Sequence, residues 1–273
     1  MRVIASIAAR EIRAGLRNRW VVAATSILAV LALVLAFLGS APQGEVDAGG
    51  LAVSVVSLSS LSIYLLPLIA LMLAYDAIVG EVENGTLLLL LAYPVSRWQV
   101  LAGKCLGHGA ILAFATIVGF GLAGVAIAVT APVSAAGVWA FFALVGSSVL
   151  LGWVFVAIGY LLSTLVRERS TAAGLAVVVW LAFVVLYDMA LLGLLTTTAG
   201  QGWIASAVPV LLLLNPADAY RLFNLMGLPE VQTFAGLGSA GQGVSVWLPL
   251  SALVAWIAAP LGAAWLVFSA KEL

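Results

Sequence analysis

The sequence predicts an all-α membrane protein of six transmembrane helices. Its composition, its long apolar stretches and the distribution of its charges support this prediction. Of the 273 residues, 64% are hydrophobic and 8% are charged, and the mean hydropathy is +1.23. Soluble domains contain about 45–50% apolar and about 25% charged residues. So few charges cannot cover a water-exposed globule of this length, and we therefore expect lipid to surround most of the chain.

Six stretches are long enough to cross a bilayer, whose hydrocarbon core needs about 20 apolar residues of helix. They are residues 20–39, 57–79, 105–130, 138–164, 171–197 and 244–269. A seventh apolar run, 203–214, is too short to span and ends at Asn215-Pro216. It is predicted as a re-entrant or interfacial segment. No linker divides the chain, so residues 1–273 are expected to form one transmembrane domain.

The basic residues predict the orientation, because Lys and Arg favour the cytoplasmic side of a membrane. Ten of the eleven lie in the N-terminal arm (1–19), the second-to-third connection (80–104), the fourth-to-fifth connection and the tail, and only Arg221 lies in the opposite connections. We therefore expect both termini in the cytoplasm and residues 199–243 on the external side. The net charge of zero gives no indication of a nucleic-acid partner.

The N-terminal arm has the pattern of an amphipathic helix. One side holds Arg2, Arg10, Arg13 and Arg17, and the other holds Ile4, Ile7, Ala8 and Ile12. Such a helix is expected to lie among the lipid headgroups, with its apolar back toward the membrane. Glu11 falls on the apolar side and therefore needs a partner. Two alternatives remain open, a basic group on another cytoplasmic element or a neighbouring arginine.

The second-to-third connection contains a turn signal at Asn84-Gly85 and an apolar run, 87–92, that is too short to cross. Ser96 suits the N-cap of a following helix that enters the bilayer near Lys104. This pattern predicts a short surface helix, a turn and an entering helix, through which a soluble partner could transmit force. An ordinary solvated loop with capping residues is the alternative.

Between the fifth and sixth spans, Asn215, Pro216 and Asp218 suit the first positions of a helix. A short external amphipathic helix is expected there, and together with 203–214 it forms a cap region. Asp188, beside Tyr187, lies inside the fifth span, where acids are costly and often functional. A role in a transport path and a structural role both remain open. Asp76, near the cytoplasmic end of the second span, is expected to join a polar network with Glu81 and Arg97.

Several kinds of chemistry are absent from the sequence. It contains no G-x-x-x-x-G-K-[ST] phosphate loop, and its single histidine, His108, excludes an H-E-x-x-H zinc site. Cys105 and His108 lie about one helical turn apart, but they supply only two ligands where structural zinc needs four. We therefore expect neither an enzyme nor a metal site, and no cofactor bound by this chain.

The connection also resembles a known family. The run Glu81-x-Glu83-x-Gly85-Thr86, followed by Pro94-x-Ser96-Arg97 and Gly103-Lys104, is similar to the coupling segment of type-2 ABC-exporter permeases. The resemblance implies six spans after an amphipathic N-terminal helix, and a cytoplasmic coupling helix that docks on a separate ATPase holding ATP and Mg. The residues expected to couple to that ATPase are Glu11, Glu81, Glu83, Asn84, Gly85, Thr86, Pro94, Ser96 and Arg97.

A narrower resemblance lies at residues 214–221, which are similar to a stretch in the permeases that serve assembly of the copper-sulfur centre of nitrous-oxide reductase. It implies a bacterial inner-membrane homodimer with two ATPase subunits and a periplasmic β-helical partner. The residues expected to dock that partner are Asn215, Pro216, Asp218, Tyr220 and Arg221. The hypothesis is a permease for export of a sulfur species or for mechanical coupling. The alternatives are an ABC permease that exports a lipid or small toxin, and a stand-alone secondary transporter, which normally shows internal repeats or broken helices.

Overall fold

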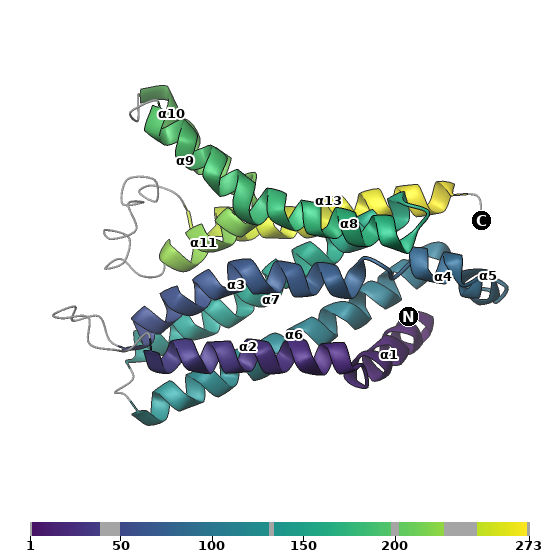
Figure 1. Ribbon diagram of the computed structural model, residues 1–273, viewed down its shortest axis with the longest axis horizontal. Helices are drawn as coiled ribbons and strands as arrows, with labels where there is room; N and C mark the ends of the chain where they lie inside the picture. The colour runs from purple at the N-terminus through teal and green to yellow at the C-terminus, as the bar shows by residue number, and fades with distance from the viewer. Residues whose placement is uncertain (1, 39–49, 131–133, 198–201, 227–244, 272–273) are drawn as a thin grey trace.

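The protein is an elongated bundle of long helices (Figure 1). The computed structural model describes residues 2–38, 50–130, 134–197, 202–226 and 245–271, and those residues contain no β-strand. The helices are α1 (Arg2–Leu16), α2 (Arg19–Leu38), α3 (Gly50–Ala74), α4 (Val79–Glu83), α5 (Thr86–Leu91), α6 (Arg97–Thr130), α7 (Ala135–Leu165), α8 (Arg169–Leu181), the π-helical turn η1 (Ala182–Leu186), α9 (Tyr187–Thr197), α10 (Gly202–Leu213), α11 (Pro216–Met226) and α13 (Trp247–Ala270).

Both ends of the chain lie at one end of the bundle, together with α4 and α5 (Figure 1). We name this the proximal end, and the opposite end the distal end. At the distal end α9 and α10 diverge from the other helices. Nearly all the basic residues therefore gather at the proximal end, as the sequence pattern requires.

Helix α7 is the centre of the bundle, because it packs against α3, α13 and α6. The side chains of Phe155 and Tyr160 on α7 are completely buried. Close approach depends on small residues: a Cβ atom on Gly159 would lie 2.7 Å from the Cβ atom of Ala74 on α3. Small residues at contact points allow helices in lipid to gain packing energy, since burial against a neighbour replaces contact with acyl chains.

Five helices are long and apolar enough to cross a membrane, within residues 55–83, 97–130, 135–165, 169–196 and 247–270. A sixth is obtained if α1 and α2, which bend by 68° at their junction, are taken as one span. The all-α membrane fold predicted from the sequence is therefore confirmed. The predicted first span corresponds to α2, and the arm before it forms the separate helix α1.

The predicted cap region consists of α10 and α11, and α10 has only 12 residues. It is not among the helices that could span, in agreement with the sequence. Residues 227–244, which include the Gly-rich part of this connection, lie outside the described residues.

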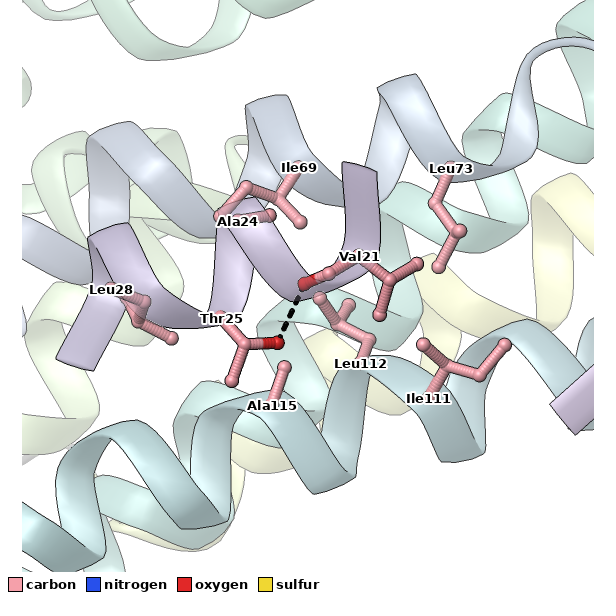
Figure 2. A pocket seen from close by; sticks show the side chains of 9 residues that line it. All are labelled: Val21, Ala24, Thr25, Leu28, Ile69, Leu73, Ile111, Leu112 and Ala115. Carbon is pink, nitrogen blue, oxygen red and sulfur yellow. Dashed lines mark hydrogen bonds between the residues drawn. The ribbon is translucent and has the colours of Figure 1, made fainter. Parts of the chain in front are cut away.

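A small apolar cavity lies between α2, α3 and α6 (Figure 2). Its lining includes Leu28, Ile69 and Leu112, and its volume of about 10 Å³ has room for about one water molecule. The hydroxyl of Thr25, its polar lining side chain, donates to the backbone carbonyl of Val21 at 2.8 Å. No polar group in it is left to bind a solute, so this cavity is packing space.

Candidate functional site

Helices α4 and α5 form a hairpin that extends from the proximal end of the bundle (Figure 1). Gly85 makes the turn between them with a φ of +68°, in the left-handed region that glycine adopts without a steric cost. Leu87 is buried against the bundle, whereas Leu88, Leu89 and Tyr93 are 57%, 69% and 70% exposed. The hairpin therefore presents large apolar side chains at a charged end of the protein, as a docking segment does.

The turn after the hairpin contains a reciprocal helix cap. The amide of Gln99 donates to Oγ of Ser96 at 3.3 Å, and the amide of Ser96 donates to Oε1 of Gln99 at 3.0 Å. This is a capping box, and it confirms Ser96 as the predicted N-cap of the entering helix. The box fixes the angle at which the hairpin joins α6.

Arg97 binds the end of the last helix. Its guanidinium donates to the backbone carbonyls of Phe268, Ser269 and Lys271 at 2.7, 3.0 and 2.7 Å. These carbonyls are the unsatisfied acceptors at the C-terminus of α13. Arg97, the first residue of α6, therefore ties the start of α6 to α13 just after the hairpin. The expected network of Asp76 with Glu81 and Arg97 is wrong because this guanidinium faces α13.

A buried cluster of charge joins three elements at the base of the hairpin. Nζ of Lys104 on α6 lies 3.0 Å from Oε1 of Glu11 on α1 and 2.9 Å from Oε1 of Glu81 on α4. The Lys104 side chain is only 6% exposed. Glu11 therefore has its partner on another element, which decides between the two alternatives that the sequence left open. The second oxygen of Glu81 is buried without a hydrogen-bond partner.

His108 lies beside this cluster, one turn further into α6. Its Nδ1 atom is 2.9 Å from the hydroxyl of the buried Tyr160, and its Nε2 atom is 3.7 Å from Oε2 of Glu11. A cavity of about 460 Å³ opens here, and its lining includes His108, Glu11 and Asp76. Cys105 is buried in the apolar core. The pair that the sequence considered for metal binding is therefore used for packing and for a hydrogen bond.

The hairpin is also tied to the connection between α7 and α8. Oε1 of Glu83 accepts from the backbone amide of Arg169 at 2.7 Å, so a carboxylate from α4 caps the N-terminus of α8. The guanidinium of Arg169 pairs with Asp76 at 2.6 Å. Asp76 and Glu83 thus both contact Arg169, a residue that the predicted network of Asp76, Glu81 and Arg97 did not include.

Helix α1 packs along α6 over two glycines. A Cβ atom on Gly103 would lie 2.8 Å from Cβ of Ile7, and one on Gly107 would lie 2.5 Å from Cβ of Glu11. The apolar side of α1 is therefore partly covered by α6, and its apolar side chains remain half-buried. The predicted position of α1 among the lipid headgroups stays a prediction.

At the distal end, Asn215 is the predicted N-cap of α11, since its Oδ1 accepts from the amide of Ala217 at 3.0 Å. Its Nδ2 donates to the carbonyl of Phe183 at 2.8 Å and to Oδ2 of Asp218 at 2.9 Å. Phe183 lies in η1, where wider helical turns break the regular hydrogen-bond ladder. Asn215 therefore joins α11 to the irregular turn of the fifth span.

A second ionic cluster lies next to this cap. Arg221 donates to Oδ1 of Asp218 and to Oδ2 of Asp188, both at 2.7 Å. The pKa of Asp218 is raised to about 7, mainly by burial; the Arg221 guanidinium lowers it and the nearby Asp188 carboxylate raises it. Tyr187, adjacent to Asp188, donates to the carbonyl of Leu211 at 2.7 Å. The cluster borders a cavity of about 260 Å³ whose other walls are leucines.

The residues predicted to dock an external partner lie mostly inside the bundle. Asn215, Asp218 and Tyr220 are fully buried, and Pro216 is buried as well. The Tyr220 hydroxyl lies 2.8 Å from Oγ of Ser148 in the core. In this conformation these side chains hold α11 in the bundle, because their polar atoms are satisfied internally; the Arg221 side chain remains 31% exposed.

Sequence reasoning missed Lys104, Arg169 and the exposed hairpin side chains Leu88, Leu89 and Tyr93 as site residues. A lysine at the entry to an apolar span was a usable signal, because a buried ammonium needs a carboxylate partner. Nothing in a leucine run distinguishes its buried members from its exposed ones until the hairpin is placed.

Comparison with known proteins agrees with this architecture. Residues 5–273 match the ABC-2 family transporter protein family. The chain is 46% identical over 275 residues to the probable ABC transporter permease protein NosY of Stutzerimonas stutzeri, covering 98% of each chain. It is 47% identical over 265 residues to the protein of the same name from Pseudomonas aeruginosa, covering 96% of this chain and 94% of the relative. The chain therefore belongs to the ABC-2 family of transporters and is a multi-pass permease subunit of an ABC transporter.

Proposed function

We propose that this permease is moved by an ATPase on a separate chain, which docks on the α4–α5 hairpin. The observation that carries the proposal is the hairpin itself, whose exposed apolar tip extends from the bundle while its base is anchored to three other elements. Glu81 reaches Lys104 on α6, Glu83 caps α8, and Arg97 caps α13. Force that the ATPase applies to the tip is thereby transmitted to several helices of the bundle.

In this proposal the predicted coupling residues divide into two groups. Glu11, Glu81, Glu83, Ser96 and Arg97 fix the hairpin to the bundle, and Asn84, Gly85, Thr86 and Pro94 shape its turns. The contact with the ATPase comes from Leu88, Leu89 and Tyr93. ATP and Mg are bound by the ATPase, and this chain binds no cofactor, since its sequence has no phosphate loop.

The complex contains two copies of this chain and two ATPase subunits in a bacterial inner membrane. The proximal end, with both termini, faces the cytoplasm. Ten of the eleven basic residues gather there, which supports this orientation.

The work of the complex is assembly of the copper-sulfur centre of nitrous-oxide reductase, through export of a sulfur species or mechanical coupling to a periplasmic β-helical protein. Sequence identity of 46% and 47% to permeases named NosY supports this assignment over export of a lipid or toxin. The partner meets the distal end, where α10 and α11 lie. Asp188 and Arg221 hold that region to the fifth span and so transmit movement to it.

The ATPase contact is tested by Leu89→Asp, with Leu165→Asp as the matched control. Leu165 is a 55% exposed leucine at the same end of the bundle, outside the hairpin. We expect Leu89→Asp to abolish co-purification of the ATPase in mild detergent. The new carboxylate would be buried in an apolar contact without a partner, which is energetically costly. The control should retain the ATPase, and both variants should unfold at the wild-type temperature. Retention of the ATPase by Leu89→Asp would overturn the docking assignment.

The physiological role is tested by deleting the gene in a host that makes nitrous-oxide reductase. We expect the purified reductase to lack its copper-sulfur centre, as measured by its visible absorption, and plasmid-borne wild-type chain to restore it. A complete centre in the deletion strain contradicts the proposed role. Transport by the purified chain alone, in vesicles without an ATPase, would identify a secondary transporter instead.

A further inference from the structure

The exposed side of α1 is a cluster of arginines. Arg2, Arg10 and Arg13 fall within an arc of about 80° on one side of α1, and Arg17 follows directly after its last residue, Leu16. All four side chains are exposed, and so is Arg19 at the start of α2. We name these five residues the arginine face.

Within the part of the chain that the structure describes, the arginine face has no counter-charge paired with it. The single acid of α1, Glu11, points the other way and is bound to Lys104 at 3.0 Å. Among the described residues, no carboxylate forms an ion pair with Arg2, Arg10, Arg13, Arg17 or Arg19. The opposite charges of α1 are therefore separated, with the negative group inside the bundle and the positive groups outside it.

The apolar side of α1 is only partly covered. Ile7 and Glu11 lie against the glycines of α6, and a Cβ atom on Gly107 would also lie 3.2 Å from the backbone carbonyl of Ala8. The apolar side chains of α1 remain half-buried, whereas its arginines are exposed. An interfacial helix inserts its apolar side among acyl chains, and its charged side then meets the headgroups.

The position of α1 places that face at the level of the headgroups. The helix bends by 68° from the span that follows it, so when α2 crosses the membrane α1 lies across its surface. The hairpin helix α5 reaches further along the long axis than α1 does (Figure 1). A protein docked on the hairpin tip would therefore sit beyond α1, whereas lipid headgroups lie beside it.

We propose that the arginine face is a binding site for the phosphate groups of anionic membrane lipids. Arginine forms bidentate hydrogen bonds with phosphate, and clusters of four or more basic residues on an amphipathic helix attract anionic headgroups. Because the arginine face binds through charge, it discriminates by lipid charge. Bound lipid stabilises the packing of α1 on α6, in which Glu11 pairs with Lys104 at the base of the hairpin. The lipid site does not depend on the identity of the ATPase or the cargo.

The site is tested on the purified chain by native mass spectrometry, with graded additions of phosphatidylglycerol or phosphatidylcholine. We expect tight, salt-sensitive binding of phosphatidylglycerol and no comparable binding of phosphatidylcholine. A basic residue at a membrane surface contributes about 1 kcal/mol, so Arg13→Gln should weaken phosphatidylglycerol binding about fivefold. Changing Arg2, Arg10, Arg13 and Arg17 together to Gln should weaken it by several hundredfold, on the order of the fourth power of that factor.

Two controls separate charge from folding. Replacing the same four arginines by lysine keeps the charge and should keep most of the binding. Both four-site variants should unfold at the wild-type temperature in neutral detergent, because glutamine and lysine are good helix formers on an exposed face.

Three results would overturn the proposal. The first is unchanged phosphatidylglycerol binding by the four-site Gln variant. The second is equal competition by soluble glycerol phosphate at the same phosphate concentration, which would identify a site for free phosphate anions. The third is loss of ATPase co-purification in that variant with lipid binding intact, which would identify the arginine face as a protein contact.

Discussion

Nζ of Lys104 lies 3.0 Å from Oε1 of Glu11, although the two residues are 93 positions apart in the chain. The contact fastens α1 to α6, and the bond from the same Nζ to Glu81 fastens both to the hairpin. One ammonium thus serves two carboxylates in a site that is largely closed to water. Such a site is sensitive to loss of its cation, because each carboxylate then remains buried without compensation.

We therefore expect Lys104→Met to destabilise the protein by about 3–5 kcal/mol, the usual cost of removing one partner of a buried ion pair. The measurement is thermal unfolding of the purified chain in mild detergent, followed by tryptophan fluorescence. Arg167→Met is the control, because Arg167 is exposed at the same end. An unfolding temperature equal to that of the wild type would show that the cluster contributes little.

The sequence predicted this site only in part. The position of Glu11 on the apolar side of α1 required a partner, and Lys104 at the entry to an apolar span was one of the basic residues that could supply it. Matching the two required the packing of α1 on α6, which depends on the absence of side chains at Gly103 and Gly107. In a chain with 27 glycines, that spacing has little predictive value.

Gly107→Ala should displace α1 from α6. The added Cβ atom would lie 2.5 Å from Cβ of Glu11 and 3.2 Å from a backbone carbonyl, which cannot rotate away. Gly121→Ala, on the same helix, is the matched control, because a Cβ atom there would meet nothing within 4 Å. Both changes gain about 1 kcal/mol of helix propensity. A difference in behaviour between the two variants therefore reports the contact between Gly107 and α1.

The displacement is measured by limited trypsin digestion, since α1 contains several arginines at which trypsin cleaves. We expect Gly107→Ala to be cleaved within α1 several times faster than the wild type, and Gly121→Ala to be cleaved at the wild-type rate. Equal rates for the two variants would mean that α1 does not depend on this glycine.

The turn of the hairpin gives a third prediction, which concerns backbone strain alone. Gly85 has a φ of +68°, and a Cβ atom there meets nothing within 4 Å. Gly85→Ala should therefore cost about 1–2 kcal/mol, Gly85→Asn less because asparagine tolerates this conformation, and Gly85→Val more because it is β-branched. Yields of co-purified ATPase should fall in the order Asn, Ala, Val. Equal yields would show that the turn can change conformation without losing the contact.

The distal cluster shows a different limit of sequence reasoning. Asn215, Pro216 and Asp218 correctly predicted the start of α11, because capping depends on neighbouring residues in the chain. Their exposure depended on where α11 packs, and Tyr220 and Asp218 prove to be buried against the core. Asp188 was recognised as costly in its span, whereas its partner Arg221 lies 33 residues away and could not be assigned from the pattern.

Asp218 gives a prediction for the pH dependence of stability. In the folded protein its pKa is raised from 3.8 to about 7, mainly by burial and also by the Asp188 carboxylate. Below pH 3.8 the carboxyl is protonated in both the folded and unfolded states, so it contributes no difference. As the pH rises toward 7 the unfolded chain releases this proton while the folded protein retains it, and stability falls by up to about 4 kcal/mol. Above that pH both states are ionised, and the loss is constant.

Asp218→Asn should remove this pH dependence. The replacing amide can still accept from Arg221, and it has no proton to lose. We expect the variant to be more stable than the wild type by an amount that grows as the pH rises from 5 to 7 and then stays constant to pH 8, as measured by thermal unfolding in detergent. Arg221→Gln should have the opposite effect at pH 8, because it leaves Asp188 and Asp218 adjacent without their cation. If the difference between the wild type and Asp218→Asn does not change between pH 5 and pH 8, Asp218 titrates outside this range, and Arg221 holds it ionised throughout.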